Sequence, residues 1–266
     1  MLFLEEPFKT AWENKDPFSQ IQLIKGQIYR KIDTRQTLNF LFNGQSFYIK
    51  IHEGTTVKEF LKNIFCLRLP TWGGACTEYK AIQRLHEIDV PTMDVAAFGE
   101  KGMNPFTRKS FIITRDLNPA ISLEDFCKCW TKTPPPYSTK RSIITAVASI
   151  VRKMHENGIN HRDCYICHFL LKLPYNNEKK PNIFVIDLHR AQIRRSVPER
   201  WRNKDIIALY YSVQNIGLTS RDYLLFLKTY FGNKKLKDIF SKEANLFNSL
   251  SKKAKKIADR TLRKGL

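Results

Sequence analysis

Two aspartates, Asp163 and Asp187, most strongly constrain what this chain can fold into. His161-Arg162-Asp163 comes directly after a long helical pattern, and the apolar run 182–186 leads into Asp187. The polar stretch 174–181 is the turn of a predicted hairpin, so we expect both aspartates at the same rim. One carboxylate suits a proton acceptor, and the other suits a ligand for a hard metal ion.

Length and charge set the broad class. The 266 residues provide enough material for one large or two small domains. There are 45 basic and 25 acidic residues, which gives a formal charge of +20. A surface this positive favours partners that carry phosphate, carboxylate or anionic lipid. Binding to nucleic acid is disfavoured, because no zinc-finger, homeodomain or RNA-recognition spacing is present and many basic residues are scattered along the chain.

The sequence predicts no secretory signal and no membrane span. The first apolar stretch is short and is followed by acids, and nowhere do eighteen apolar residues run together. We therefore expect a soluble or peripheral protein whose six cysteines are reduced. Cys127-x-Cys129 and Cys164-x-x-Cys167, with His161 and His168 close by, also permit a zinc site. Buried thiols that act as small apolar side chains are the favoured interpretation.

A strong hairpin signal lies at residues 37–51. Asn43-Gly44 favours the type I′ turn that matches strand twist. In the second strand, alternate residues point to opposite sides of the sheet. One side carries Phe47, Ile49 and Ile51, and the other carries Tyr48, Lys50 and His52. We expect a rigid sheet to hold Lys50, whereas the alternative is an unrestrained surface lysine.

Two helices are expected after the hairpin. Residues 57–69 are apolar at helical spacing with basic residues between, and such a helix packs on the sheet or lies against anionic lipid. The sequence leaves both alternatives open. After Gly73-Gly74 a second helix is predicted, with Thr77 as its N-cap and Glu78 in its first turn. Val90-Pro91 ends it.

The middle of the chain predicts a connector and then a helical region. Residues 110–117 form an apolar strand with a polar exit, and we assign Thr114, Arg115 and Asp116 at this exit to a nucleotide site. From Ile121 onward the pattern is helical. The clearest amphipathic helix covers 143–154 and ends at Gly158.

The remaining segments complete the expected C-terminal half. Strands are predicted at 169–173 and 182–186, and the rest of the chain is helical and basic. It closes with the lysine-rich run 252–256, which is either a solvated helix face or a contact with an anionic membrane. Asp205 is placed at the start of a helix, where its charge complements the helix dipole. The alternative, that it braces the loop of Asp163, is implied only by the resemblance described below.

The order of these parts matches the needs of phosphoryl transfer. Phosphoryl transfer requires a cation that binds the nucleotide phosphates and a second group that orients this cation. It also requires a metal ligand and an acceptor for the alcohol proton. Lys50 can be the cation and Glu78 its partner. Asp187 can bind magnesium, and Asp163, with Arg162 beside it, can take the proton. Each signal is weak alone, and their order in the chain gives them specificity.

Four stretches carry a resemblance: Tyr48-Ile-Lys-Ile-His52, Trp72-Gly-Gly-Ala-Cys-Thr-Glu-Tyr79, Asn160-His-Arg-Asp-Cys-Tyr-Ile-Cys-His168 and Val185-Ile-Asp-Leu-His-Arg190. Over nearly its whole length the chain resembles the protein-kinase-like superfamily, and more closely the bacterial lipopolysaccharide core heptose(I) kinases. The resemblance implies a bilobal α+β fold. Its N-lobe, 1–115, is an antiparallel sheet plus a helix that carries Lys50 and Glu78. Its C-lobe, 116–266, is mainly helical and contains the catalytic and metal-binding loops.

The resemblance also implies an activity and a location. It implies ATP-dependent, magnesium-dependent phosphorylation of the first heptose of the inner core, on a lipid-linked acceptor. The site would be cytoplasmic, peripheral at the inner face of the inner membrane, where an anionic membrane surface suits the basic chain. The family's phosphate-binding lysine falls on Lys50 and its catalytic aspartate on Asp163, with Glu78 and Asp187 as lysine partner and metal ligand. Acyl carrier protein is implied as a possible partner.

Several positions depart from the kinase pattern. His168 stands where protein kinases carry a metal-binding asparagine, and we assign it as a softer metal ligand. Either one metal is held less tightly there or a single magnesium ion suffices. Asp187-Leu188-His189 replaces Asp-Phe-Gly and lacks the glycine hinge. No glycine-rich phosphate loop is present near the start, where Gly26 must serve. The missing Ala-Pro-Glu motif argues against a protein substrate.

Two alternatives remain at this point. A small-molecule kinase of the aminoglycoside or choline type would share Asp163 and Asp187. A catalytically inactive kinase-like scaffold would use its basic surface to bind an acidic partner, and His168 together with the missing glycine loop favours it.

Overall fold

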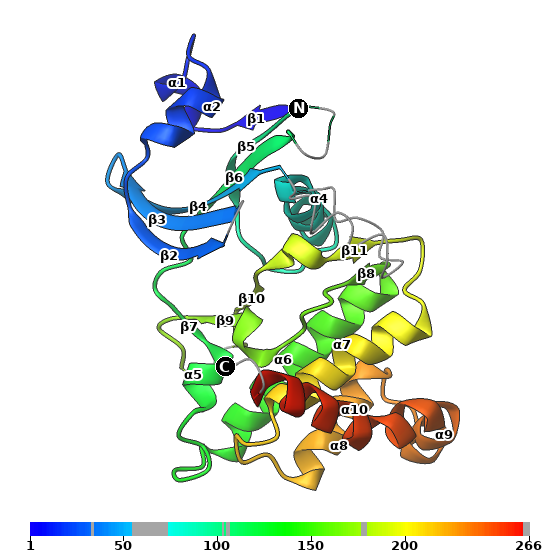
Figure 1. Cartoon of the computed structure of the whole chain (residues 1–266). Coiled ribbons are helices and arrows are strands. Elements are labelled where there is room, and N and C mark those ends of the chain that lie inside the picture. The colour runs from blue at the N-terminus through cyan, green and yellow to red at the C-terminus, as the bar shows by residue number, and fades with distance from the viewer. Residues whose placement is uncertain (33–34, 55–73, 103, 105–106, 177–179, 263–266) are drawn as a thin grey trace. The chain divides into compact units, whose positions relative to one another are not determined.

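The computed structural model describes residues 1–32, 35–54, 74–102, 104, 107–176 and 180–262, and Figure 1 shows the arrangement of the elements in each part. The chain divides into two compact units. The first comprises Met1–Arg84, Thr92–Leu117 and Asp187–Arg190, and the second comprises Leu85–Pro91, Asn118–Ile186 and Ala191–Leu266. The predicted helix at 57–69 lies outside the described residues.

The described part of the first unit is built on a six-stranded antiparallel sheet in the order β1-β5-β6-β4-β3-β2. Its strands are β1 (Leu2–Leu4), β2 (Gln27–Ile32), β3 (Arg35–Phe42), β4 (Gln45–Glu53), β5 (Val95–Lys101) and β6 (Lys109–Arg115). Short helices α1 (Phe8–Ala11), α2 (Pro17–Gln20) and η1 (Ile21–Leu23) precede β2, and η3 (Leu188–Arg190) also belongs to this unit.

The predicted hairpin is confirmed as β3 and β4. Asn43 and Gly44 both have positive φ, +49° and +75°, as a type I′ turn requires. Phe47 and Ile49 are fully buried in an aromatic-rich core, and Lys50 lies on the opposite face of the strand. Packing explains why position 26 is a glycine, because a Cβ there would lie 2.1 Å from the carbonyl oxygen of Asn39.

Helix α4 (Gly74–Glu87) begins three residues before the predicted N-cap. Thr77 therefore lies inside the helix and Glu78 lies beyond its first turn, so both predicted positions are wrong. The cap comes from another element, since Ser110 Oγ of β6 accepts a hydrogen bond from the Ala75 amide at 3.1 Å. Gly74 has φ +43°, and a Cβ there would lie 2.4 Å from the same Oγ. A cap supplied from a distant strand cannot be found in the local pattern.

The second unit is mainly helical. Its helices are α5 (Leu123–Cys127), α6 (Tyr137–Glu156), α7 (Glu199–Ser212), α8 (Ser220–Tyr230), α9 (Leu236–Lys242), α10 (Ala244–Leu262) and the short η2 (Ile166–His168). Its strands are β7 (Ala120–Ser122), β8 (Ile159–Asn160), β9 (Phe169–Lys172), β10 (Ile183–Val185) and β11 (Gln192–Ile193), which pair as β10-β9-β7 and β11-β8.

The predicted helix and hairpin of this unit are confirmed as α6 and the β9–β10 pair. Gly158 follows α6 with φ +78°, and a Cβ there would collide with the carbonyl oxygen of Arg194. Residue 121, expected in a helical stretch, instead belongs to strand β7, because it pairs with Leu171 of β9. Tertiary pairing overrides the local pattern there.

Two further observations bear on the sequence analysis. Among the described residues, no helix is long and apolar enough to cross a bilayer.

Cys127 and Cys164 are buried, and burial raises the pKa of both thiols, that of Cys127 to about 12. Within the described ranges no three metal-binding side chains gather around one point, so the zinc interpretation has no geometric support there.

Candidate active site

Lys50 of β4 holds the charged centre of the first unit. Its Nζ donates to both carboxylate oxygens of Glu78, at 2.8 and 3.1 Å, and to Oδ1 of Asp187 at 3.0 Å. Glu78 comes from α4 and is almost fully buried, whereas Asp187 directly precedes η3. The structure therefore brings together Lys50, Glu78 and Asp187, which lie far apart in the sequence.

The two carboxylates keep this lysine charged. Burial by itself lowers the pKa of Lys50, but the charges of Glu78 and Asp187 outweigh it, so the pKa is raised. Burial likewise raises the pKa of Asp187, while the hydrogen bond from His189 and the charge of Lys50 hold it well below its usual range. The site thus contains an ionised acid beside a fixed cation.

Two histidines that sequence reasoning did not assign to the site lie around these charges. His189 Nδ1 donates to Asp187 Oδ1 at 2.8 Å, because an ionised carboxylate can only accept. His52, two residues after Lys50, has a pKa lowered to about 3 by burial and by the charges of Arg35, Lys50 and His189. A neutral His52 avoids adding another positive charge beside Lys50. The alternation of β4 could have indicated His52, whereas the short η3 turn that places His189 has no local signature.

The residues assigned to the connector lie at the end of β6. Thr114 is buried and pairs with Tyr48 of β4. The Arg115 guanidinium donates to the Glu6 carbonyl at 2.7 Å and to Gln45 Oε1 at 3.1 Å. Asp116 Oδ2 accepts from Ser46 Oγ at 2.7 Å. These contacts fix the connector on the sheet, and its predicted role in nucleotide binding stays a prediction.

Asp163 and Arg162 lie in the second unit, in the loop after β8. Arg162 has φ +72°, a left-handed conformation that is uncommon for a residue with a side chain. The buried carboxylate of Asp205 holds the backbone in this conformation. It accepts hydrogen bonds from the amides of His161 at 2.6 Å and Arg162 at 2.8 Å. The loop that carries Asp163 is therefore rigidly braced.

Asp205 has the bracing role that the sequence suggested, but its predicted position is wrong. It lies in the middle of α7 and is fully buried, so the alternative of a helix N-terminal charge is excluded. His155 Nε2 lies 3.2 Å from its Oδ2, and Tyr230 hydroxyl lies 2.6 Å from the other ring nitrogen of His155. These three side chains, Tyr230, His155 and Asp205, link α8 and α6 through α7 to the loop that carries Asp163.

His168 is oriented by the same loop. Its Nδ1 lies 2.7 Å from the backbone carbonyl of Asp163, which can only accept, so Nδ1 carries a proton. Nε2 is then the nitrogen with a metal-binding lone pair when the ring is neutral. Histidine ligands in proteins are commonly held in this way through the other ring nitrogen.

The donor chemistry of these residues fits a magnesium-bound nucleotide. Asp187 supplies the ionised carboxylate oxygen that Mg²⁺ prefers, and its low pKa keeps it ionised at neutral pH. His168 belongs to the second unit, and its predicted role as a softer ligand stays a prediction. Bound magnesium would neutralise charge on the phosphates, and Lys50 is a cation of the kind that binds them.

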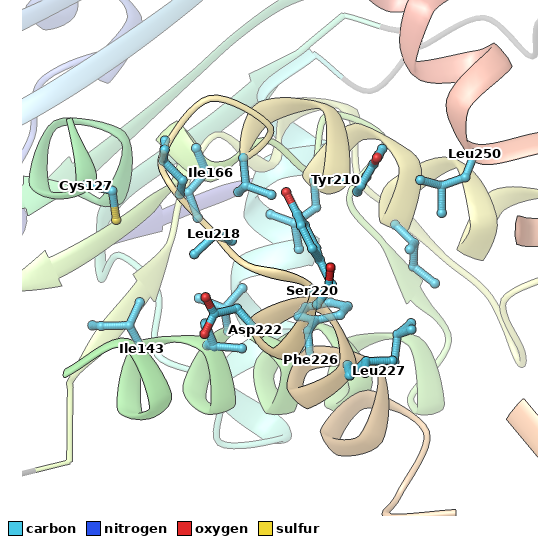
Figure 2. Close-up of a pocket in the computed structure, with 18 of the residues that line it drawn as sticks. Cys127, Ile143, Ile166, Tyr210, Leu218, Ser220, Asp222, Phe226, Leu227 and Leu250 are labelled. Carbon is cyan, nitrogen blue, oxygen red and sulfur yellow. The ribbon is translucent and has the colours of Figure 1, made fainter. Parts of the chain in front are cut away.

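The second unit also contains an apolar cavity of about 390 Å³ (Figure 2). Side chains of α6, α7 and α8 line much of it, among them Ile143, Ile206 and Leu227. Among the described residues that line it, Asp222 is the only charged one, and its carboxylate accepts from the Thr219 amide and from buried Lys140 at 3.3 Å. Such a mainly apolar lining suits an aliphatic chain.

Comparisons with known proteins agree with this geometry. The model of the lipopolysaccharide kinase (Kdo/WaaP) family matches residues 19–230. The lipopolysaccharide core heptose(I) kinase WaaP of Escherichia coli is 54% identical over 267 residues, covering 100% of both chains. The enzyme of the same name from Pseudomonas aeruginosa is 46% identical, covering 99% of this chain and 98% of its own. A solved structure described as WaaP in complex with acyl carrier protein has a TM-score of 0.84 and 44% identity, covering 96% of this chain and 98% of the other.

Proposed function

Because the chain belongs to the lipopolysaccharide kinase (Kdo/WaaP) family, we propose that it is a sugar kinase that phosphorylates the first heptose of the lipopolysaccharide inner core. The observation that carries this proposal is the full-length identity of 54% with a heptose(I) kinase. The charged centre around Lys50 and the braced loop around Asp163 supply the groups that transfer from ATP needs. The small-molecule kinase and the inactive scaffold are not favoured.

The proposed reaction moves the γ-phosphoryl group of ATP to a heptose hydroxyl. The hydroxyl oxygen forms a bond to the γ-phosphorus, the bond to the bridging oxygen of ADP breaks, and Asp163 accepts the hydroxyl proton. Lys50 binds the nucleotide phosphates, and Glu78 fixes the direction of its ammonium group. Asp205 keeps the Asp163 loop in its conformation through two backbone hydrogen bonds.

Acyl carrier protein is proposed as a partner. Support comes from the similar solved structure, which is a complex of WaaP with that protein. The charge of +20 suits an acidic partner. The apolar cavity of the second unit has the chemistry that an acyl chain would require.

We further propose that the protein works peripherally at the cytoplasmic face of the inner membrane. A lipid-linked acceptor requires such a location. Helix α10 supports it, because Lys252, Lys253, Lys255 and Lys256 are exposed on it while Ala254 between them is buried. A helix with one basic exposed face is attracted to anionic lipid. Flotation with anionic and with neutral vesicles tests this proposal, and equal recovery with both would contradict it.

The test of the function is transfer from labelled ATP to a lipopolysaccharide that lacks core phosphate. The parent protein should label the sugar, and Asp163→Ala should lower kcat by about 10²-fold or more while ATP binding is kept, because only the proton acceptor is lost. Asp259→Ala removes an exposed aspartate of α10 and serves as the control. Turnover by Asp163→Ala within about tenfold of the parent would contradict the assigned role.

A further inference from the structure

A group of cations surrounds one indole ring in the second unit. Among the described residues, four charged groups lie over the ring of Trp201 at 5.2–5.7 Å from its centroid. They belong to Arg162, Arg194, Arg200 and Lys204, and with Trp201 they are called the Trp201 cluster below.

The cluster is assembled from three separate segments. Arg162 belongs to the catalytic loop, Arg194 follows β11, and Arg200 and Lys204 lie in α7. The β8–β11 pair brings the first two segments together, since Asn160 pairs with Gln192. Arg194 donates to the side-chain oxygens of these same two residues, at 2.5 and 2.6 Å. Both partners are neutral amides, so these bonds position the Arg194 guanidinium without neutralising it.

Two carboxylates of α7 make contacts outside the cluster. Both oxygens of Asp205 accept backbone amides of the catalytic loop, and Glu199 in the first turn of α7 accepts from the side chain of Asn203 at 3.2 Å. Helix α7 has no side-chain cap at its start, and its N-terminal dipole adds to the positive potential. Cation–π attraction holds these cations at the ring, and positive charges gathered at one place attract an anion.

We propose that the Trp201 cluster binds an anionic group, phosphate or carboxylate, on the acceptor and thereby makes the enzyme selective for charged acceptors. The inference deepens the proposed function and depends on it. Arg162 is the chain neighbour of Asp163, so a group bound at the cluster is held on the same loop that receives the acceptor hydroxyl. Guanidinium groups bind such anions through paired hydrogen bonds, and the exposed Arg200 and Lys204 are reached from solvent.

Kinetics with a charged and a neutral acceptor test the proposal. The double variant R200A/K204A should raise KM for lipopolysaccharide lacking core phosphate by about tenfold or more. Its kcat and its KM for ATP should stay within about twofold of the parent, and a neutral methyl heptoside should be used equally by both proteins. The matched control K234A/K235A removes the same charge from exposed positions just before α9 and should leave every constant unchanged.

The outcomes separate this inference from the proposed function. Transfer by the parent with an unchanged KM in R200A/K204A overturns the inference and leaves the function standing. An equal rise in KM for the neutral heptoside also overturns it, since the role would then be structural. If the parent transfers to no acceptor, the proposed function fails. The cluster is then tested by titration with inorganic phosphate, followed as the fluorescence difference between the parent and W201F. A saturable change supports an anion site and no change overturns it.

Discussion

Lys50 is the residue on which the charged centre of the first unit depends. Glu78 is almost fully buried and accepts two hydrogen bonds from Lys50 Nζ, whereas Asp187 is also held by His189. Removing the lysine therefore leaves a buried carboxylate without its cation, which is far more costly than leaving an exposed one. The chemical role proposed for Lys50 can be separated from this structural role by experiment.

Lys50→Met should lower the free energy of unfolding by about 3 kcal/mol, because Glu78 loses its buried partner. It should also weaken ATP binding and abolish transfer. The double variant K50M/E78Q removes the stranded charge, so urea unfolding should show much of the stability restored while transfer stays absent. Recovery of transfer in the double variant would show that the pair is only structural.

His52 gives the first unit a dependence on acid. Its pKa is about 3 in the folded protein, against 6.5 for an ordinary histidine, so between these pH values the unfolded state binds more protons and stability rises with pH. His52→Gln should therefore flatten the pH dependence of the unfolding free energy in this window, by up to about 1.4 kcal/mol per pH unit. Urea unfolding at several pH values measures the slope. The exposed His86→Gln variant is the control, and equal slopes in the parent and His52→Gln would contradict the assignment.

At the scale of elements, α4 shows how one strand sets the start of a helix. Ser110 of β6 is buried and caps the amide of Ala75, and the helix so fixed carries Glu78. Ser110→Ala should lower the unfolding free energy by about 1 kcal/mol, the usual effect of losing a cap, and should raise KM for ATP because Glu78 is less firmly placed. Ser249→Ala is the control, since Ser249 Oγ donates only to the Leu246 carbonyl one turn before it. Unchanged stability in Ser110→Ala would exclude the cap.

In the second unit, the loop that carries Asp163 is likewise held by a residue of a distant element. Its conformation relies on Asp205, which reaches it from the middle of α7 across 44 positions of sequence. The resemblance to kinase-like folds implied the bracing role, whereas the sequence placed Asp205 at the start of a helix. Burial inside the helix is a property of packing, so only the tertiary structure could show it.

At the scale of the whole molecule, charge decides which partners can approach. The excess of 20 positive charges favours acidic proteins and anionic lipid. Binding of acyl carrier protein should therefore weaken when salt rises from about 0.1 M to about 1 M, as the Debye length falls from about 10 Å to about 3 Å. Fluorescence anisotropy with labelled acyl carrier protein measures this. The affinity that remains at high salt reports apolar contacts, and an affinity independent of salt would contradict the electrostatic account.

The sequence by itself determined the elements whose signals are local. Three such signals are confirmed, and each lies within one element or its turn. They are the Asn43-Gly44 turn, the alternation around Lys50 and the helical periodicity that ends at Gly158. The α+β class with an antiparallel sheet and a helical part is confirmed as well. Hydrophobic periodicity and turn chemistry act between neighbours in sequence, so they can be seen without coordinates.

Only the tertiary structure decided the contacts between distant segments. Four features depend on groups that packing brings together. They are the start of α4, strand β7, the hydrogen bond from His189 to Asp187 and the cations around Trp201. Electrostatic and capping interactions act over a few ångströms of space, whatever the separation in sequence. Their partners therefore cannot be identified from the order of residues alone.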